Sequence, residues 1–270
     1  AVVRPDAQLV LFSATFPPRI VRLALDLMEA PVRVAVGRTG ASSKGVRQET
    51  VVVKSFAQKL EWVRKHIAEA EMRGKVLVFV ATRQAAEDLT TALRQATTAA
   101  VDCLHGEKQQ FDRSSVMAQF KKGSLRIVIA TDVAARGLDI PLVTTVVHFD
   151  CPSSPKLFVH RTGRTARGGR EGTSVVFVTM MELPYLLDIA LYLGRPLQSS
   201  SEGYAWSDLT PERVHYGRFP RSIVDAETHA VETFLSENEE AWQLQQSMEH
   251  ANELYQKTRA KASKIGRAHV

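Results

Sequence analysis

Short apolar runs of strand length alternate with helical stretches along the middle of this chain. From Val46 to Thr179 the runs are rich in valine and isoleucine, and each is followed by a segment with helical spacing of its apolar residues. Strands that are apolar on both faces must be covered on both faces, and parallel strands need a crossover between them, usually a helix. The pattern therefore predicts an α/β fold, a doubly wound parallel sheet with helices on both faces. The expected strands are Val51–Val53, Val76–Ala81, Val101–Leu104, Arg126–Ala130, Val143–Phe149 and Thr173–Thr179. The expected helices are Ala57–Ala70, Ala85–Arg94, Gln109–Lys121 and Ser154–Thr165.

The segment before this domain combines two short apolar runs with one amphipathic stretch. Leu9–Phe12 and Val32–Val36 are predicted strands, and Arg19–Met28 between them is a predicted helix. Gly37–Gly45 is rich in glycine and serine and shows no apolar periodicity. We therefore expect a linker between the segment and the domain.

The segment after the domain is more polar and ends in a long helical pattern. Leu183–Leu193 is apolar nearly all round, which predicts a buried helix, whereas Tyr204–Arg221 reads as irregular. Asp225–Lys261 has the spacing of one long helix, which either packs on the neighbouring domain or docks onto a partner protein. Its basic end, Lys257–Lys264, reads as a solvated helix end or, less simply, as an RNA contact.

The composition favours a globular chain with a polyanionic partner. Of its residues, 44% are hydrophobic and 24% charged, and no apolar run approaches a membrane span, so no membrane partner is expected. The net charge of +6 favours a polyanion, and with aromatics at only 7% backbone contact is expected rather than base stacking. Cys103 and Cys151 lie in or beside apolar runs and read as reduced buried thiols of an intracellular protein. No metal site is predicted.

Polar residues follow several of the predicted strands. His105 and Gly106 follow one strand and precede a helix, and Thr131 ends another. Ligands collect at the carboxyl ends of parallel strands, and a helix N-terminus suits a phosphate. Gln110 and Arg113 are three residues apart on that helix, so they share a face on which Arg113 can reach the same anion. The alternative for these two residues is simple solvation.

Three arginines recur at a spacing of three, at Arg161, Arg164 and Arg167. This spacing predicts one stripe along a helix. A basic surface patch or a set of structural salt bridges would explain it. So would phosphoryl transfer, in which an arginine finger stabilises the charge that develops on the γ-phosphate.

Asp139 lies just past a strand end, where a carboxylate can accept hydrogen bonds from a ribose hydroxyl. A helix cap and a partner for Arg136 are equally reasonable roles for this side chain.

Five motifs occur in this order: SAT (Ser13–Thr15), VFVATR (Val78–Arg83), HGEKQQFDR (His105–Arg113), TDVAARGLDI (Thr131–Ile140) and HRTGRTAR (His160–Arg167). Together they resemble the later half of the motif series of the DEAD-box ATP-dependent RNA helicases, over roughly residues 8–180. The resemblance implies that residues 1–36 end a first RecA-like, ATP-binding domain. Residues 37–45 would be the linker, 46–198 the second RecA-like domain, and 199–270 a C-terminal extension with a long helix.

The resemblance also implies a role for individual residues. RNA-backbone contacts would come from Thr82, Arg83, Gly106, Gln110, Arg113 and Thr131. ATP contacts would come from Gly137, Asp139, Arg161 and Arg164, the last two being catalytic and Arg164 the finger. Coupling or support would come from Ser13, Thr15, His160 and Arg167.

The chain contains neither a GxxxxGK[ST] phosphate loop nor a DEAD tetrapeptide. ATP and Mg²⁺ are the implied cofactors, and most of their ligands would lie on a first domain outside this chain. We therefore expect this chain alone to be inactive, as half of an RNA-stimulated ATPase.

Two further features resemble the nucleolar branch of the family that acts in large ribosomal subunit assembly. One is Ala166, where the family usually has glycine and where we expect a helix interior. The other is a set of three segments, Glu182–Asp188, Leu193–Arg195 and Gly217–Asp225. They imply pre-rRNA as the RNA, pre-ribosomal proteins as partners of the extension, and a nuclear, nucleolar location. The alternatives are an RNA-placed scaffold or assembly factor with little ATPase and, less favoured, a DNA-directed helicase.

Overall fold

The computed structural model describes residues 4, 7–12, 18–34, 45–66, 74–135, 139–166, 170–199, 210, 212–218, 233 and 236–268. The predicted functional residues Ser13, Thr15, Gly137 and Arg167 lie outside these ranges, as does most of the predicted linker. The chain divides into two compact units, Ala1–Ala41 and Ser42–Val270. Among the described helices, none is both long and apolar enough to cross a membrane.

The first unit contains one described helix, α1 (Pro18–Leu27), close to its predicted position. The strand predicted over Leu9–Phe12 is not found, and residues 32–34 of the other predicted strand are also without regular structure. A strand needs a partner for its backbone groups, and none of the described residues of this unit provides one. Phe12 and Val32 are accordingly almost fully exposed.

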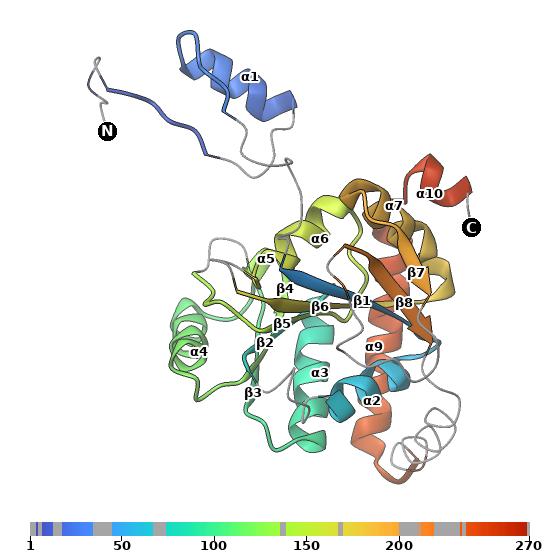
Figure 1. The fold of residues 1–270 in the computed structure, drawn as a ribbon. Coiled ribbons are helices and arrows are strands. Elements are labelled where there is room, and N and C mark those ends of the chain that lie inside the picture. The colour runs from blue at the N-terminus through green and yellow to red at the C-terminus, as the bar shows by residue number, and fades with distance from the viewer. Residues whose placement is uncertain are drawn as a thin grey trace. The chain divides into compact units, whose positions relative to one another are not determined.

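The second unit is built on an eight-stranded sheet in which all pairings are parallel (Figure 1). The strand order is β3-β4-β2-β5-β6-β1-β8-β7. The strands are β1 (Val46–Val52), β2 (Val76–Val80), β3 (Val101–Leu104), β4 (Ile127–Thr131), β5 (Thr145–His148), β6 (Gly172–Val178), β7 (Leu197–Ser199) and β8 (Val214–Arg218). All the strands predicted from Val46 to Thr179 are present, so the predicted fold class is confirmed.

Helices cover both faces of this sheet. They are α2 (Phe56–His66), α3 (Arg83–Ala96), α4 (Gln110–Lys122), α5 (Asp132–Ala135), α6 (Pro155–Thr162), α7 (Leu183–Leu193), α9 (Glu239–Thr258) and α10 (Lys264–Ala268), with a 3₁₀ turn, η2 (Met180–Glu182). Side chains alternate between the faces along each strand. In β2, Val76, Val78 and Val80 face a core shared with α2, α3 and α9, whereas Leu77 and Phe79 face one shared with α4. This two-sided burial explains the continuous apolar runs.

β7 and β8 extend the sheet where the sequence predicted irregular chain. β8 pairs in parallel with β1, with His215 opposite Glu49. Its residues, VHYGR, have few apolar side chains and a glycine, so composition alone does not indicate a strand. Pairing with the edge of an existing sheet supplies the stability that its composition lacks.

The predicted long helix is shorter than expected. α9 begins at Glu239, after the non-helical Asn238, and ends at Thr258. It lies beside α3, as Figure 1 shows, and buries Met248 in the core. Packing on the neighbouring domain, one of the two interpretations of this helix, is therefore what the structure shows.

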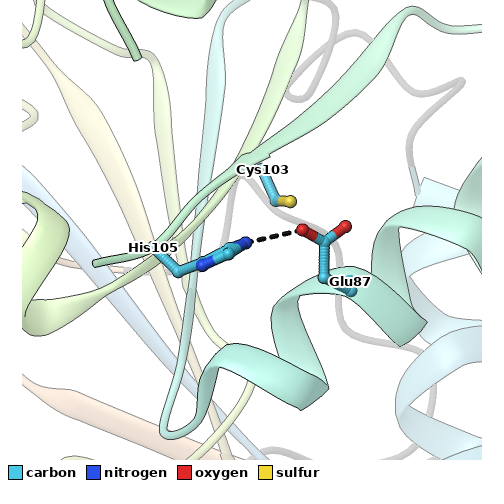
Figure 2. Close-up of side chains that lie close together, drawn as sticks. All are labelled: Glu87, Cys103 and His105. Carbon is cyan, nitrogen blue, oxygen red and sulfur yellow. Dashed lines mark hydrogen bonds and ion pairs between the residues drawn. The ribbon is translucent and has the colours of Figure 1, made fainter. Parts of the chain in front are cut away.

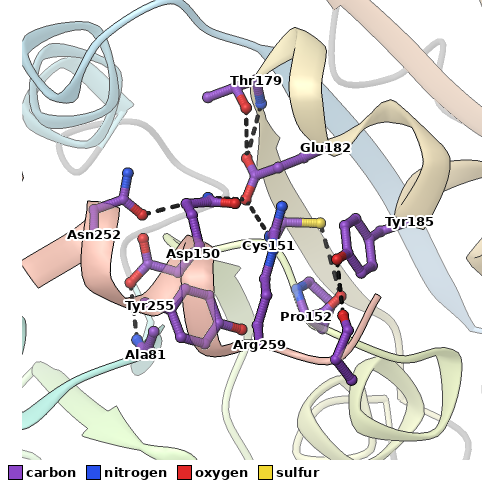
Figure 3. Close-up of polar contacts among 12 residues, drawn as sticks. Ala81, Asp150, Cys151, Pro152, Thr179, Glu182, Tyr185, Asn252, Tyr255 and Arg259 are labelled. Atoms are coloured by element: carbon purple, nitrogen blue, oxygen red, sulfur yellow. Dashed lines mark hydrogen bonds and ion pairs between the residues drawn. The ribbon is translucent and has the colours of Figure 1, made fainter. Parts of the chain in front are cut away.

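The basic end of that helix is not fully solvated, which corrects the simpler of its two interpretations. The side chain of Arg259 is only 4% exposed and donates to Oε1 of Glu182 over 2.8 Å, and its guanidinium lies 4.1 Å from the ring centroid of Tyr185 (Figure 3). Burial opposes ionisation of Glu182, yet Lys59, the Thr179 N–H and Arg259 together hold its pKa below the usual value. The side chain of Arg259 thus attaches the extension to the domain.

Replacing Arg259 by leucine should cost about 3–5 kcal/mol of unfolding free energy, because the buried carboxylate of Glu182 loses the cation that is bonded to it. Urea denaturation monitored by circular dichroism measures this loss. Lys257→Leu, an exposed cation two residues earlier, is the control and should change stability by less than about 0.5 kcal/mol. Equal effects of the two substitutions would contradict the attachment.

Candidate functional site

The carboxyl ends of the neighbouring strands β3, β4 and β2 bring three predicted RNA-contacting residues to one edge of the sheet. Thr131 is the last residue of β4, Thr82 follows β2, and Gly106 follows β3. Thr82 caps α3, because its Oγ1 accepts a hydrogen bond from the Ala85 N–H over 3.1 Å. A Cβ added at Gly106 would meet no atom within 4 Å, so packing does not require glycine there and the position is open to a ligand.

Arg83 and the α4 pair lie around this same edge. Arg83 is exposed and forms an ion pair with Glu107, which joins the chain after β2 to the chain after β3. Arg113 donates to Oε1 of Gln110 over 3.4 Å and to the carbonyl oxygen of Ala134 over 3.3 Å. Gln110 and Arg113 therefore share a face of α4, as predicted, and Arg113 also connects α4 to α5.

Arg161 is buried and points into the domain. Its Nε and Nη2 donate to the two carboxylate oxygens of Asp132 over 2.7 and 2.8 Å, and Nη1 donates to the carbonyl oxygen of Asp150 over 2.8 Å. Only 1% of the residue is exposed, and its guanidinium lies 5.2 Å from the ring centroid of Phe79. In this structure Arg161 joins the start of α5 to the chain just after β5, and its predicted contact with ATP stays a prediction. The structural salt bridge was one of the alternatives left open above.

Arg164 lies in a turn, because α6 ends at Thr162. Its Nη2 donates to the carbonyl oxygen of Ala135 over 3.5 Å, and the residue is half-buried. Arg161 and Arg164 therefore do not lie on one helical stripe, and Arg167 falls outside the described residues. After the capping residue Gly163, the chain leaves the helix and Thr165 forms a β-bridge with Val143.

Ala166 is not inside a helix either. Its φ is 52°, in the left-handed region, and the residue is buried. A side chain in this conformation costs about 1 kcal/mol relative to glycine, because Cβ approaches the following carbonyl oxygen. The structure thus gives a physical reason for glycine at this position in the family, and alanine is tolerated at a modest cost.

Asp139 and His160 are both exposed. Oδ2 of Asp139 accepts a hydrogen bond from Nζ of Lys121 over 2.7 Å, and this bond with the lysine charge lowers the pKa of Asp139. Its predicted contact with a ribose stays a prediction, as does the supporting role of His160, which lies in the last turn of α6.

A buried polar network beside Arg161 gave no signal in the sequence. Nε2 of His148 lies 3.1 Å from Oγ of Ser174 and 3.3 Å from Oγ1 of Thr162, so the network joins β5, β6 and α6. Burial, with a smaller contribution from the Arg161 charge, holds the pKa of His148 well below its usual value of 6.5. His148 is the last residue of the short strand β5 and belongs to none of the five motifs, so the motifs do not indicate it.

A cavity of about 270 Å³ lies at the carboxyl edge of the sheet, partly under α9. Lys59 and Asp150 line it, and Nζ of Lys59 lies 3.3 Å from Oδ1 of Asp150. Oδ2 of Asp150 accepts a hydrogen bond from the Ala81 N–H over 2.8 Å (Figure 3). Thr82 lines it as well, together with Asn252 of α9. The predicted RNA-contacting edge therefore continues into a cavity of mixed polar and apolar lining, to which the extension contributes residues.

The comparisons with known proteins agree with this geometry. Residues 58–169 match the family described as the helicase conserved C-terminal domain. The chain is 37% identical over 200 residues to the probable ATP-dependent RNA helicase ddx42 of Dictyostelium discoideum, covering 74% of this chain and 20% of that protein. It is 38% identical over 204 residues to the pre-mRNA-processing ATP-dependent RNA helicase PRP5 of Phaeosphaeria nodorum, covering 74% and 17%. The chain thus spans about a fifth of the length of these relatives.

The structural likeness extends over more of the chain. S. cerevisiae Dbp5 bound to RNA and ADP BeF3 matches 86% of this chain and 56% of its own, with a TM-score of 0.64 and 28% sequence identity. The parallel sheet with its polar carboxyl edge is thus a RecA-like fold. More particularly, the chain carries a helicase conserved C-terminal domain over residues 58–169 and is similar to the DEAD-box ATP-dependent RNA helicases.

The buried histidine predicts how stability depends on pH. Because the folded pKa of His148 lies below its unfolded value, its contribution is present above pH 6.5 and is lost as the pH falls below that value. We expect the unfolding free energy to fall by up to about 1.4 kcal/mol per pH unit between about pH 6 and 5. Urea denaturation of the wild type and of His148→Gln at several pH values measures this dependence. The slope of unfolding free energy against pH should be smaller in the variant, by the amount that one proton contributes. His160→Gln, on the exposed side of α6, should keep the full slope; a His148→Gln slope like the wild type's would refute the assignment.

Proposed function

We propose that the full protein is an RNA-stimulated ATPase that remodels RNA or RNA–protein complexes, and that this chain supplies its RNA-backbone contacts and an arginine finger. The observation that carries the proposal is the convergence of Thr82, Gly106 and Thr131 at one edge of a helicase C-terminal domain. Arg83 and Arg113 bring cations to the same edge. The structurally similar S. cerevisiae Dbp5 was solved bound to RNA and ADP BeF3, which supports both kinds of ligand for the full protein.

RNA recognition would depend on phosphates rather than on bases. The residues at this edge are threonines, a glycine and cations, and none of them is an aromatic platform for a base. Phosphate contacts carry no sequence information, so affinity should vary little among unrelated single strands and should fall with salt.

Arg113→Ala in the full protein should weaken RNA binding about equally for all sequences and reduce the slope of log affinity against log salt by about one. Fluorescence anisotropy with two unrelated single strands over a range of salt concentrations measures both effects. Lys122→Ala, an exposed cation at the other end of α4, serves as the matched control. An unchanged slope for Arg113→Ala would remove this residue from the interface.

ATP turnover would need Arg164 rather than Arg161. Arg164 lies in the turn after α6 and makes one long hydrogen bond to the carbonyl of Ala135 in addition to its other contacts. Its guanidinium has a planar fork that suits phosphate oxygens, and in the proposed mechanism it reaches a nucleotide held by the first domain. Arg161 would act through Asp132, by holding α5 in place.

Arg164→Ala in the full protein should lower ATP turnover on the order of a thousandfold. The RNA-stimulated release of phosphate measures this effect, and a melting curve shows that the variant is folded. Lys156→Ala, an exposed cation of α6, should leave turnover unchanged. Near-normal turnover in Arg164→Ala would contradict the assignment of Arg164 as the arginine finger.

We further propose pre-ribosomal RNA of the large subunit as the substrate class, with a nuclear, nucleolar location and pre-ribosomal proteins as partners of the extension. The support is the resemblance of Glu182–Asp188, Gly217–Asp225 and Ala166 to the nucleolar branch. The name of PRP5 favours pre-mRNA as a second candidate. Ultraviolet crosslinking followed by sequencing of the bound RNA separates them: large-subunit pre-rRNA would support the first candidate, and intron-containing or spliceosomal RNA the second.

A scaffold function with incidental turnover remains the alternative to an active helicase. RNA-stimulated ATPase of the full protein distinguishes the two, because a scaffold would show no stimulation. Comparing duplex RNA with duplex DNA as the unwinding substrate tests the DNA-directed alternative.

A further inference from the structure

A glutamate, a cysteine and a histidine meet at the end of β3. Cys103 and His105 are two residues apart, so their side chains project from the same side of the strand, and this side is covered by α3. α3 contributes Glu87 (Figure 2). One ligand atom from each residue lies within 4.8 Å of the others.

These three side chains supply the donor atoms that zinc prefers. Zinc binds thiolate sulfur, imidazole nitrogen and carboxylate oxygen, and three protein ligands with water in the fourth position form an open tetrahedral site. In such a site neighbouring ligand atoms lie about 3.5 Å apart, from the usual zinc–ligand distances. The ligand atoms of this cluster lie within 4.8 Å of one another, so movements of about an ångström would bring them to the distances of a zinc site.

Glu87 is the ligand that must move when zinc binds, and its side chain has the space to do so. Nε2 of His105 and Oε1 of Glu87 lie 2.5 Å apart as a hydrogen bond and would separate by about an ångström around a zinc ion. The side chain of Glu87 is 50% exposed, whereas Cys103 is fully buried and the His105 side chain is only 9% exposed. The strand thus holds two ligands in fixed positions, and the third reaches them from a helix surface.

The surroundings leave the cluster available to a cation. Nδ1 of His105 is buried and has no partner among the described residues, so Glu87 provides the only hydrogen bond of this ring. The neighbouring cation Lys108 is neutralised, because its Nζ donates to Oδ1 of Asp102 over 2.8 Å. A metal would therefore replace one hydrogen bond of the imidazole and meet no uncompensated positive charge.

We propose that Glu87, Cys103 and His105 form a zinc site with a fourth position open to water. On binding, the Cys103 thiol releases its proton to solvent and the sulfur forms the Zn–S bond. The imidazole proton moves from Nε2 to Nδ1, so that Nε2 can bind the metal, and the Glu87 carboxylate exchanges its hydrogen bond for a bond to zinc. No electron is transferred, and the site does not rest on the proposed helicase activity.

The sequence alone does not predict this site. A single Cys-x-His pair lacks the two paired ligand spacings of structural zinc motifs. Glu87 precedes the pair by 16 and 18 positions, and only the packing of α3 on β3 brings it there.

Cobalt is the direct probe, because a thiolate bound to Co²⁺ gives a charge-transfer absorption that other ligands do not. Titration of the chelator-treated full chain with Co²⁺ should produce this band with one equivalent, and Zn²⁺ should displace the cobalt. Cys103→Ala should abolish the band. Cys151→Ala, the matched control, removes the chain's other buried thiol and should retain the band.

Glu87→Gln keeps the shape of the side chain at an exposed position, so the variant should fold normally. Its Zn²⁺ affinity, measured by competition with a chromophoric chelator, should fall more than about tenfold, which is the least that loss of an outer-shell partner costs. Glu253→Gln, exposed on α9, should bind Zn²⁺ like the wild type. The proposal is overturned by the absence of the band, by its persistence in Cys103→Ala, or by unchanged affinity in Glu87→Gln.

Discussion

All the strands of the sheet run in one direction, and the placement of the proposed RNA-contacting residues depends on this. A parallel sheet ends at a single edge, so polar residues that follow strands far apart in sequence become neighbours in space. Thr82, Gly106 and Thr131 lie together because β2, β3 and β4 are adjacent and parallel. The two-sided apolar cover of these strands supplies the stability that fixes this edge, since the edge itself is polar and contributes little to the core.

One ion pair, between a buried arginine and a partly buried aspartate, stabilises the same edge. A bidentate arginine–carboxylate pair has a fixed planar geometry, and separating its partners in the interior leaves an uncompensated charge. Arg161 and Asp132 form such a pair, and the bond to the Asp150 carbonyl adds a third fixed point. The HRTGRTAR segment therefore combines two tasks. Its first arginine holds the neighbouring motif in place, and we propose that its second, Arg164, meets the nucleotide.

The sequence predicted the parts of the fold that depend on local pattern. The strands from Val76 to Val178 and helices such as α7 follow from apolar runs and helical periodicity, which are properties of neighbouring residues. β8 was not predicted, because its stability comes from pairing with β1 rather than from its own side chains. The left-handed Ala166 was also missed, since a spacing of three arginines suggests a helix while the Thr165–Val143 bridge breaks it.

The sequence predicted only those parts of the candidate site whose roles follow from the motifs and their spacing. Gln110 and Arg113 share a face because helical spacing places them there, and the structure shows the same. Asp132, His148 and Glu87 acquire their roles from packing, because their partners lie many residues away in sequence. A long-range contact between side chains leaves no periodic trace in a single sequence.

The ion pair of Arg259 with Glu182 has a consequence for where this domain ends. Two further bonds join the same elements, from the Tyr185 hydroxyl to the Ala260 carbonyl and from the Ser263 N–H to Asp188. The segment Glu182–Asp188, which resembles the nucleolar branch, is thus also the surface on which the extension packs. A version of this domain cut after α7 would expose the apolar residues against which Met248 packs, and would leave the buried carboxylate of Glu182 without Arg259. The smallest piece that keeps this core intact therefore runs through α10.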